Sequence, residues 1–190
     1  MKTKIIALHI HDHFLLGEID NQLHKTPLKF NSLPSGKECI AWLEALFTLH
    51  LLKRHKDELH YIKTFVAKKT YPEVLDILRT AQYELNNHYT ATKKETAKAE
   101  HFMLVLNGLK DDDKKIEINS LITPCTMLFI GIITACDNII RQYRTQYLCG
   151  LKSKRQFYLQ RKLVLKKFAN IRRLIQEEKK KNNLTIQTLK

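Results

Sequence analysis

The stretch LITPCTMLFIGIITAC, residues 121–136, decides the fold because it is the longest apolar run of the chain and carries no charge. Thr123 followed by Pro124 predicts a helix start, with the threonine as cap and the proline as the first helical residue. The run is shorter than the ~18 to 20 apolar residues that span a bilayer. The pattern therefore favours a buried core helix, ending near Cys149 and Gly150, over a membrane span.

A second long helix is expected after this core helix. Ser153 is a predicted cap, and the helix would run from Lys154 to about Lys181. One side carries apolar residues at helical spacing, namely Val164, Phe168, Ile171 and Ile175. About 200° around the helix from members of this stripe stand Arg155, Lys162, Lys166 and Arg173. One face is thus expected to pack, and the other to present cations.

The two C-terminal helices form a strongly basic pair. Between Asp137 and Glu177 the chain has no acidic residue. The cations in this interval are Arg141, Arg144, Lys152, Lys154, Arg155, Arg161, Lys162, Lys166, Lys167, Arg172 and Arg173. Solvated helix faces usually mix signs, because Glu and Lys four residues apart support the helix. Phosphate binding is therefore favoured here, with a solvated surface and a membrane or protein contact as the alternatives.

The composition of the whole chain agrees with a folded, basic protein. It has 190 residues, 44% of them hydrophobic, and a formal charge of +14. This balance excludes wholesale disorder and favours phosphate-rich partners or anionic surfaces. The four cysteines stand far apart without a C-x-x-C pair, and the N-terminus has no apolar region of signal-peptide length. We expect reduced, buried thiols in a cytoplasmic protein.

Upstream of the core helix, three further helices are predicted. Ser35 and Glu38 form a capping-box pattern before a helix that reaches about His55. Asp57 is expected to cap the next helix. Thr70 and Glu73 repeat the capping-box pattern around Pro72, which predicts a third helix that runs to Leu106 or pauses near residues 86–88.

Two short strands complete the expected fold. Residues 2–8 alternate, with Ile6, Leu8 and Ile10 on one face, and KIEIN at 115–119 alternates after a turn at Asp111 to Asp113. Residues 17–34 are expected to be mostly loop, with a brief helix near residues 19–24. The fold class is mainly α with a short β-ribbon (α+β), a helical bundle with an N-terminal ribbon-helix-helix-like strand. We expect one domain over residues 1–181, its strand at about 2–13, and a disordered tail over 182–190.

The histidines of LHIHDHF, namely His9, His11 and His13, would all point to one side of a strand. Such a cluster is able to hold zinc, but surface or nucleic-acid contact is favoured, and no metal or other cofactor is assigned. The chain has no G-x-S-x-G, P-loop or dinucleotide-binding glycine pattern. The sequence therefore predicts a binding protein with no catalytic residues rather than an enzyme.

Three segments carry a resemblance to a known family: IALHIHDHFLLGE at 6–18, LPSGKECIAWLEALFTLHLL at 33–52 and TPCTMLFIGIITACDNIIRQYRTQYLCGLKSK at 123–154. They resemble the AcaB-like transcriptional regulators of integrating conjugative elements. The resemblance implies a dimeric DNA-binding regulator in which paired N-terminal strands enter the major groove. The groove-facing residues would be His9 and His11, with Ile5 and Ala7. A strand left unpaired within the chain would also favour a homodimer.

The sequence thus predicts a cytoplasmic, DNA-binding transcriptional regulator of conjugative or mobile-element genes. A helical interaction protein that binds another regulator or RNA is the alternative, and a metal-dependent enzyme comes third. Expected partners are duplex DNA, a second copy and a regulatory protein, with no membrane. The predicted DNA-binding residues are His9, His11, Arg141, Arg144, Lys152, Lys154, Arg155, Arg161, Lys162, Lys166 and Arg173.

Overall fold

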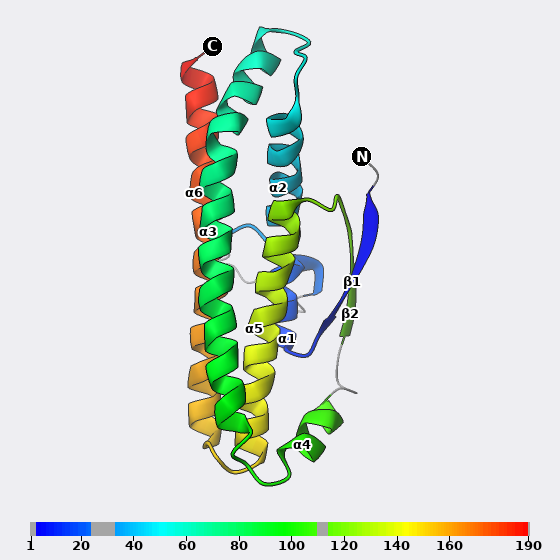
Figure 1. Ribbon diagram of the computed structural model, residues 1–190, viewed down its shortest axis with the longest axis vertical. Coiled ribbons are helices and arrows are strands. Elements are labelled where there is room, and N and C mark those ends of the chain that lie inside the picture. Colours follow the sequence, from blue (N-terminus) through cyan, green and yellow to red (C-terminus); the bar gives the residue numbers. More distant parts are fainter. Residues whose placement is uncertain (1–2, 24–32, 110–113, 190) are drawn as a thin grey trace.

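The computed structural model describes residues 3–23, 33–109 and 114–189, and shows an elongated bundle of long helices with a two-stranded β-ribbon on one side (Figure 1). The mainly α class with a short ribbon is confirmed. The elements, in chain order, are β1 (Lys4–Ile10), α1 (His13–Ile19), the 3-10 turn η1 (Asn21–Leu23), α2 (Gly36–Leu51), α3 (Glu58–Thr96), α4 (Phe102–Gly108), β2 (Lys114–Ser120), α5 (Pro124–Leu148) and α6 (Lys154–Thr188).

Helix α5 is the centre of the core, as its apolar sequence predicts. Thr123 and Thr126 form a capping box at its start, and Gly150 adopts a φ of 77° just after its end. Phe129, Ile132 and Ile139 are fully buried. By length and composition α5 would be able to cross a membrane, but 61% of its most apolar window is buried inside the bundle. This burial is typical of the core helix of a bundle.

Helix α3 is one continuous helix from Glu58 to Thr96, so the predicted third helix start at Pro72 is wrong. Asp57 caps the helix as expected, by accepting from the His60 N–H. The Pro72 ring is exposed, so the carbonyl that loses its hydrogen-bond partner there can turn to water. Buried residues on both sides of it, such as Val66 and Val74, hold the helix in place.

The predicted continuation of this helix to Leu106 is also wrong. After Thr96 the chain turns, His101 takes up a left-handed φ of 57°, and the separate short helix α4 follows. Around Asn86, where a pause was the alternative, α3 continues without a break. The predicted turn at residues 111–113 and the loop residues 24–32 lie outside the described part of the chain.

The ribbon pairs β1 with β2 in antiparallel register, from Lys4 opposite Ser120 to Ile10 opposite Lys114. Leu8 and Ile10 are buried on its inner face and Ile5 is exposed on the outer one, which confirms the predicted alternation. Both strands belong to the same chain. The N-terminal strand is thus paired within the chain, so it gives no reason of its own to expect a homodimer.

Helix α1 was not predicted from the sequence. The strand was expected to continue to about residue 13, and a loop was expected from residue 17. The strand ends at Ile10, and Asp12 caps a helix by accepting from the Leu15 N–H at 2.8 Å. Leu15 and Ile19 are fully buried, so this short helix is held by core packing. Only the 3-10 turn η1 forms in the predicted 19–24 helix, whose last residue is outside the described part.

Helix α6 begins as predicted, with a capping box between Ser153 and Gln156. It continues to Thr188, so the expected disordered tail is wrong for residues 182–188. Asn182 is buried, and its Oδ1 accepts from the Thr70 hydroxyl of α3 at 2.6 Å. This contact ties the last turns of α6 to α3.

Candidate nucleic-acid interface

A row of cations follows the outer side of α6. Arg155, Lys162, Lys166 and Arg173, which we call the basic stripe, are all exposed. Their separations of seven, four and seven residues keep them within about 40° of one another around the helix, and spread them over ~27 Å of its length. The helix turns this way because Val164 and Phe168 are fully buried on the opposite side. The predicted division of α6 into a packed face and a cationic face is confirmed.

The basic stripe has no carboxylate in its own part of the chain, since no acidic residue lies between Asp137 and Glu177. Arg173 donates to the side-chain oxygen of Asn170 at 3.0 Å, and the first carboxylate along α6, that of Glu177, follows four residues later. Lys154, at the start of α6, is exposed as well. This surface therefore offers several positive charges to water and to any anionic partner.

The predicted cations of α5 have a different environment. Arg141 is half-buried, and its Nη2 donates to the carbonyl of Leu106 at 2.6 Å, which fastens the end of α4 to α5. Arg144 is half-buried beside it. Lys152 contacts Glu95 at 3.2 Å and lies over the Tyr143 ring. Arg141 and Lys152 join helices at this end of the bundle, and none of the three cations lies on the basic stripe.

Arg161 also makes its contacts within the chain. Its guanidinium lies 4.3 Å from the Phe14 ring centroid and 4.8 Å from that of Tyr158. One of its nitrogens is 3.8 Å from Asp12 Oδ2, and the arginine side chain is 19% exposed. Stacked and paired in this way, Arg161 anchors α1 to α6 rather than presenting its charge to a ligand.

His11 does not face outward from a strand, as the sequence analysis expects. Its Nδ1 lies 2.6 Å from Asp137 Oδ2, and its backbone N–H donates to Asp137 Oδ1 at 2.9 Å. The Asp12 N–H donates to the same oxygen at 3.0 Å. Asp137 is buried on α5, so it fixes the chain where β1 ends and α1 begins. Burial raises the pKa of the neighbouring Asp12 carboxyl.

The predicted histidine row is therefore broken up. His9 is exposed on the outer face of β1, His11 is held by Asp137, and His13 is the first residue of α1. Among residues 3–23, 33–109 and 114–189, no group of three His, Cys, Asp or Glu side chains is arranged to hold a metal ion. The one-sided arrangement fails because the strand ends before His11.

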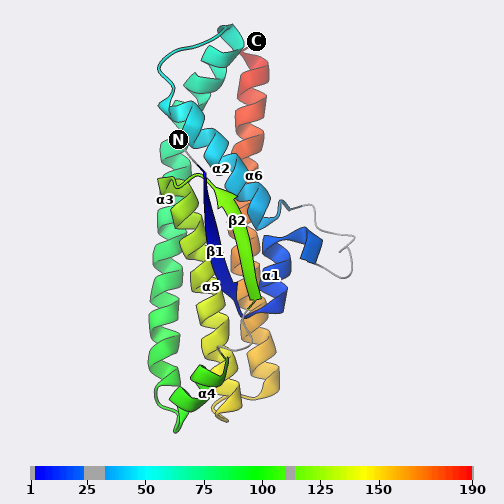
Figure 2. The same ribbon diagram turned by 90° about the vertical axis from the view of Figure 1, so that its right-hand side faces the viewer.

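The predicted DNA-binding residues lie on two separate sides of the molecule. The ribbon that carries His9 lies at the right in Figure 1 and in front of the helices in Figure 2, whereas α6 lies at the left and behind. One straight duplex is therefore unable to contact the outer face of the ribbon and the basic stripe together. The structure does not unite the strand and the helix in one surface.

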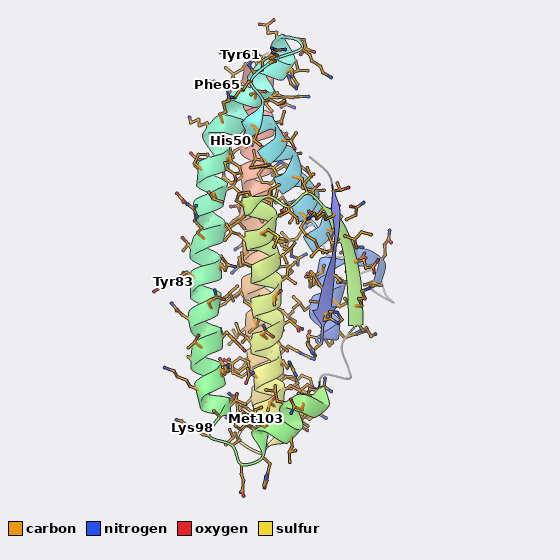
Figure 3. The ribbon with its side chains drawn as sticks, turned by 45° about the vertical axis from the view of Figure 1, so that its right-hand side comes forward. His50, Tyr61, Phe65, Tyr83, Lys98 and Met103 are labelled. Carbon is orange, nitrogen blue, oxygen red and sulfur yellow. The ribbon has the colours of Figure 1, made fainter. Side chains whose placement is uncertain are left out.

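Two features of this charge pattern do not follow from the sequence. Arg172, one of the eleven cations between Asp137 and Glu177, is 1% exposed, donates to the Pro34 carbonyl at 2.9 Å and pairs with the Glu18 carboxylate. A second basic cluster, which the sequence did not suggest as a binding site, consists of Lys53, Arg54 and Lys56, exposed in the loop between α2 and α3. The run KRHK was the available signal for this cluster. The loop lies at the end of the bundle where Tyr61 and Phe65 are found (Figure 3).

Comparisons with protein-family models, with curated proteins and with solved structures give no match to this chain. The resemblance to AcaB-like regulators stays a prediction.

Proposed function

We propose that the protein is a cytoplasmic, DNA-binding transcriptional regulator of conjugative or mobile-element genes, which works as a homodimer by binding without turnover. The observation that carries the proposal is the basic stripe, in which four exposed cationic side chains are aligned on one helix. Each cation that neutralises a phosphate releases condensed counterions from the duplex into the solution, and this release favours binding, most strongly at low salt.

The basic stripe makes phosphate contacts, which position a protein on DNA but carry no sequence information. Sequence reading requires groups that reach base edges in a groove. His9 on the ribbon belongs to the other side of the molecule, so its contribution requires a second DNA segment or a bent one. The proposal therefore assigns affinity to α6 and leaves base reading as a separate property to be measured.

The test is fluorescence anisotropy with labelled duplexes, one of random sequence and several from the neighbourhood of the gene, at a series of salt concentrations. Binding that weakens steeply with salt, and is tighter for one neighbourhood fragment, is the expected result. Changing Arg155, Lys162, Lys166 and Arg173 together to Gln is expected to lower the slope of log K against log salt by up to ~3.6, at ~0.9 per phosphate.

A matched control removes the same number of charges from exposed positions of α3, by changing Lys68, Lys69, Lys93 and Lys94 to Gln. Both variants have the same net charge, so a difference between their slopes measures position rather than overall charge. Equal slopes for the two variants would contradict the proposed interface. No binding of the wild-type protein at low salt would refute DNA binding altogether.

A second candidate is a non-enzymatic helical interaction protein that binds another regulator or RNA. An open, apolar groove between α3 and α6 favours it, because such a groove suits a partner helix. This candidate predicts weak duplex binding together with a partner held at the groove.

A further inference from the structure

An open groove runs between α3 and α6, on the side of the bundle away from the ribbon (Figure 1). Its volume is about 490 Å³. The floor is apolar and is formed by Ile77, Ala81, Leu85, Ile171 and Leu174. Leu174 is 42% exposed, and Leu163, about three turns earlier on α6, is 46% exposed. Leucine side chains of α6 thus face water.

The two walls of this groove carry opposite charge. Glu73, Asp76 and Glu84 line the α3 wall, and Lys167 lines the α6 wall. Asp76 lies 3.5 Å from Arg79 in an exposed ion pair, and Glu73 interacts electrostatically with Lys181 of α6, so Glu84 is the acidic feature on which the interface depends most. An acidic wall on a chain of charge +14 is unsuited to DNA but suits a basic helix.

Glu84 and Lys167 stand at the same level of the bundle. The hydrogen bond between Thr70 and Asn182 fixes the relative heights of the antiparallel helices α3 and α6. Glu84 is fourteen residues from Thr70 along α3, and Lys167 is fifteen residues from Asn182 along α6. At ~1.5 Å per residue, the two paths descend by about 21 and about 22.5 Å.

We infer that this groove is the interface for a second copy of the chain, related by a twofold axis that runs parallel to the two helices. Such an axis keeps every residue at its own height and places α3 of one copy on α6 of the other. Glu84 of each copy then faces Lys167 of the other, and the two apolar floors cover each other. The inference rests on the proposed function, because it locates the homodimer that this function assumes.

A second copy of the chain is the partner that the charges of the two walls favour. The complement of an acidic wall beside an apolar floor is a helix that is apolar along one side and basic beside it, and α6 of this same chain has that pattern at Leu174 and Lys167. A twofold arrangement satisfies both walls at once, since each wall meets its opposite. Arg155 precedes Lys167 by more than three helical turns, so the start of the basic stripe lies outside the groove.

The first test is the molar mass in solution, measured without DNA by light scattering after size exclusion and by sedimentation. The expected mass is twice that of the 22.4 kDa chain. Leu174→Glu places a carboxylate on the apolar floor and is expected to raise the dimer dissociation constant at least tenfold. Ile5→Glu makes the same kind of change on the exposed outer face of β1, on the other side of the molecule, and is expected to leave the mass unchanged.

The second test is a charge exchange across the interface. Glu84→Lys alone brings two cations together, and Lys167→Glu alone brings two carboxylates together, so each is expected to weaken the dimer. The combined variant restores opposite charges both between copies and within one chain. Because this variant also restores the pairing within one chain, the two single variants are mixed as well. Their mixture places opposite charges only between copies, so recovery of a dimer there is specific to the pairing of α3 of one copy with α6 of the other.

Two results would overturn the inference: a wild-type protein that is monomeric at high micromolar concentration, or a dimer that withstands both Leu174→Glu and the single charge changes. Circular dichroism and melting of each variant separate a lost interface from a lost fold. Because mass is measured without DNA and anisotropy measures DNA binding, a failed interface is distinguishable from a failed DNA-binding function.

Discussion

Replacing Asp137 by alanine removes the acceptor that holds the junction between β1 and α1. The carboxylate accepts the backbone N–H groups of His11 and Asp12 at 2.9 and 3.0 Å, and it pairs with the His11 ring at 2.6 Å. Asp137 is 2% exposed, so water does not readily replace it. Alanine therefore leaves two backbone donors without their partner.

The size of the effect follows from these lost contacts. A buried donor without a partner costs about 1 to 3 kcal/mol, so two of them cost at least about 3 kcal/mol when the lost pairing with His11 is included. For a chain of this size, each kcal/mol shifts the melting temperature by roughly 2 to 4 °C. Asp137→Ala is expected to lower the melting temperature by roughly 6 to 12 °C.

Calorimetry or circular dichroism melting measures this shift, and Glu117→Ala is the control. Glu117 is exposed on the outer face of β2 and pairs with Lys115 at the surface, so its loss is expected to change the melting temperature little. Asp137→Asn keeps one acceptor oxygen and is expected to fall between the two. An Asp137→Ala protein that melts within about 2 °C of the wild type would refute this account of the junction.

Three further predictions concern thiols, pH and the end of α6. Burial raises the pKa of Cys39 and Cys136 to about 12 and that of Cys125 to about 11, so a thiol reagent is expected to modify only half-buried Cys149 in the native protein and all four cysteines after denaturation. Burial, helped by Lys167, lowers the pKa of His88. The stability that neutral His88 contributes is present above pH 6.5 and is lost as the pH falls through the lower folded-state pKa. His88→Gln is therefore expected to make the melting temperature depend less on pH between pH 7.5 and 5.5. Asn182→Ala removes the hydrogen bond from Thr70 and is expected to cost about 1 kcal/mol and to speed amide exchange in the last turns of α6.

Helix starts were predictable because the contacts that define them are local. The caps at Ser35, Asp57, Thr123 and Ser153 each accept from a backbone N–H three residues later, so both partners lie within one short stretch of sequence. The alternation of the two strands was readable for the same reason. Their pairing with each other joins residues more than a hundred positions apart, which no local pattern reports.

The errors arose where distant contacts decide the structure. Pro72 together with Thr70 looks like a helix start, but packing of α3 along the bundle keeps the helix continuous through it. The role of His11 depends on Asp137, and that of Arg172 depends on Glu18. In the candidate site, a uniform run of charge identified α6 as basic. It did not distinguish the cations that remain exposed from those used to join helices.

The contacts around α1 also bear on how the protein folds while it is being synthesised. Asp12 and Glu18 are held by Arg161 and Arg172, and β1 pairs with a strand that starts at Lys114. At a synthesis rate of ~5 to 20 residues per second, Arg172 follows Asp12 by roughly 8 to 30 seconds. Asp12 and Glu18 therefore lack these arginine partners until α6 has been synthesised, and a chain that stops before α6 never gains them.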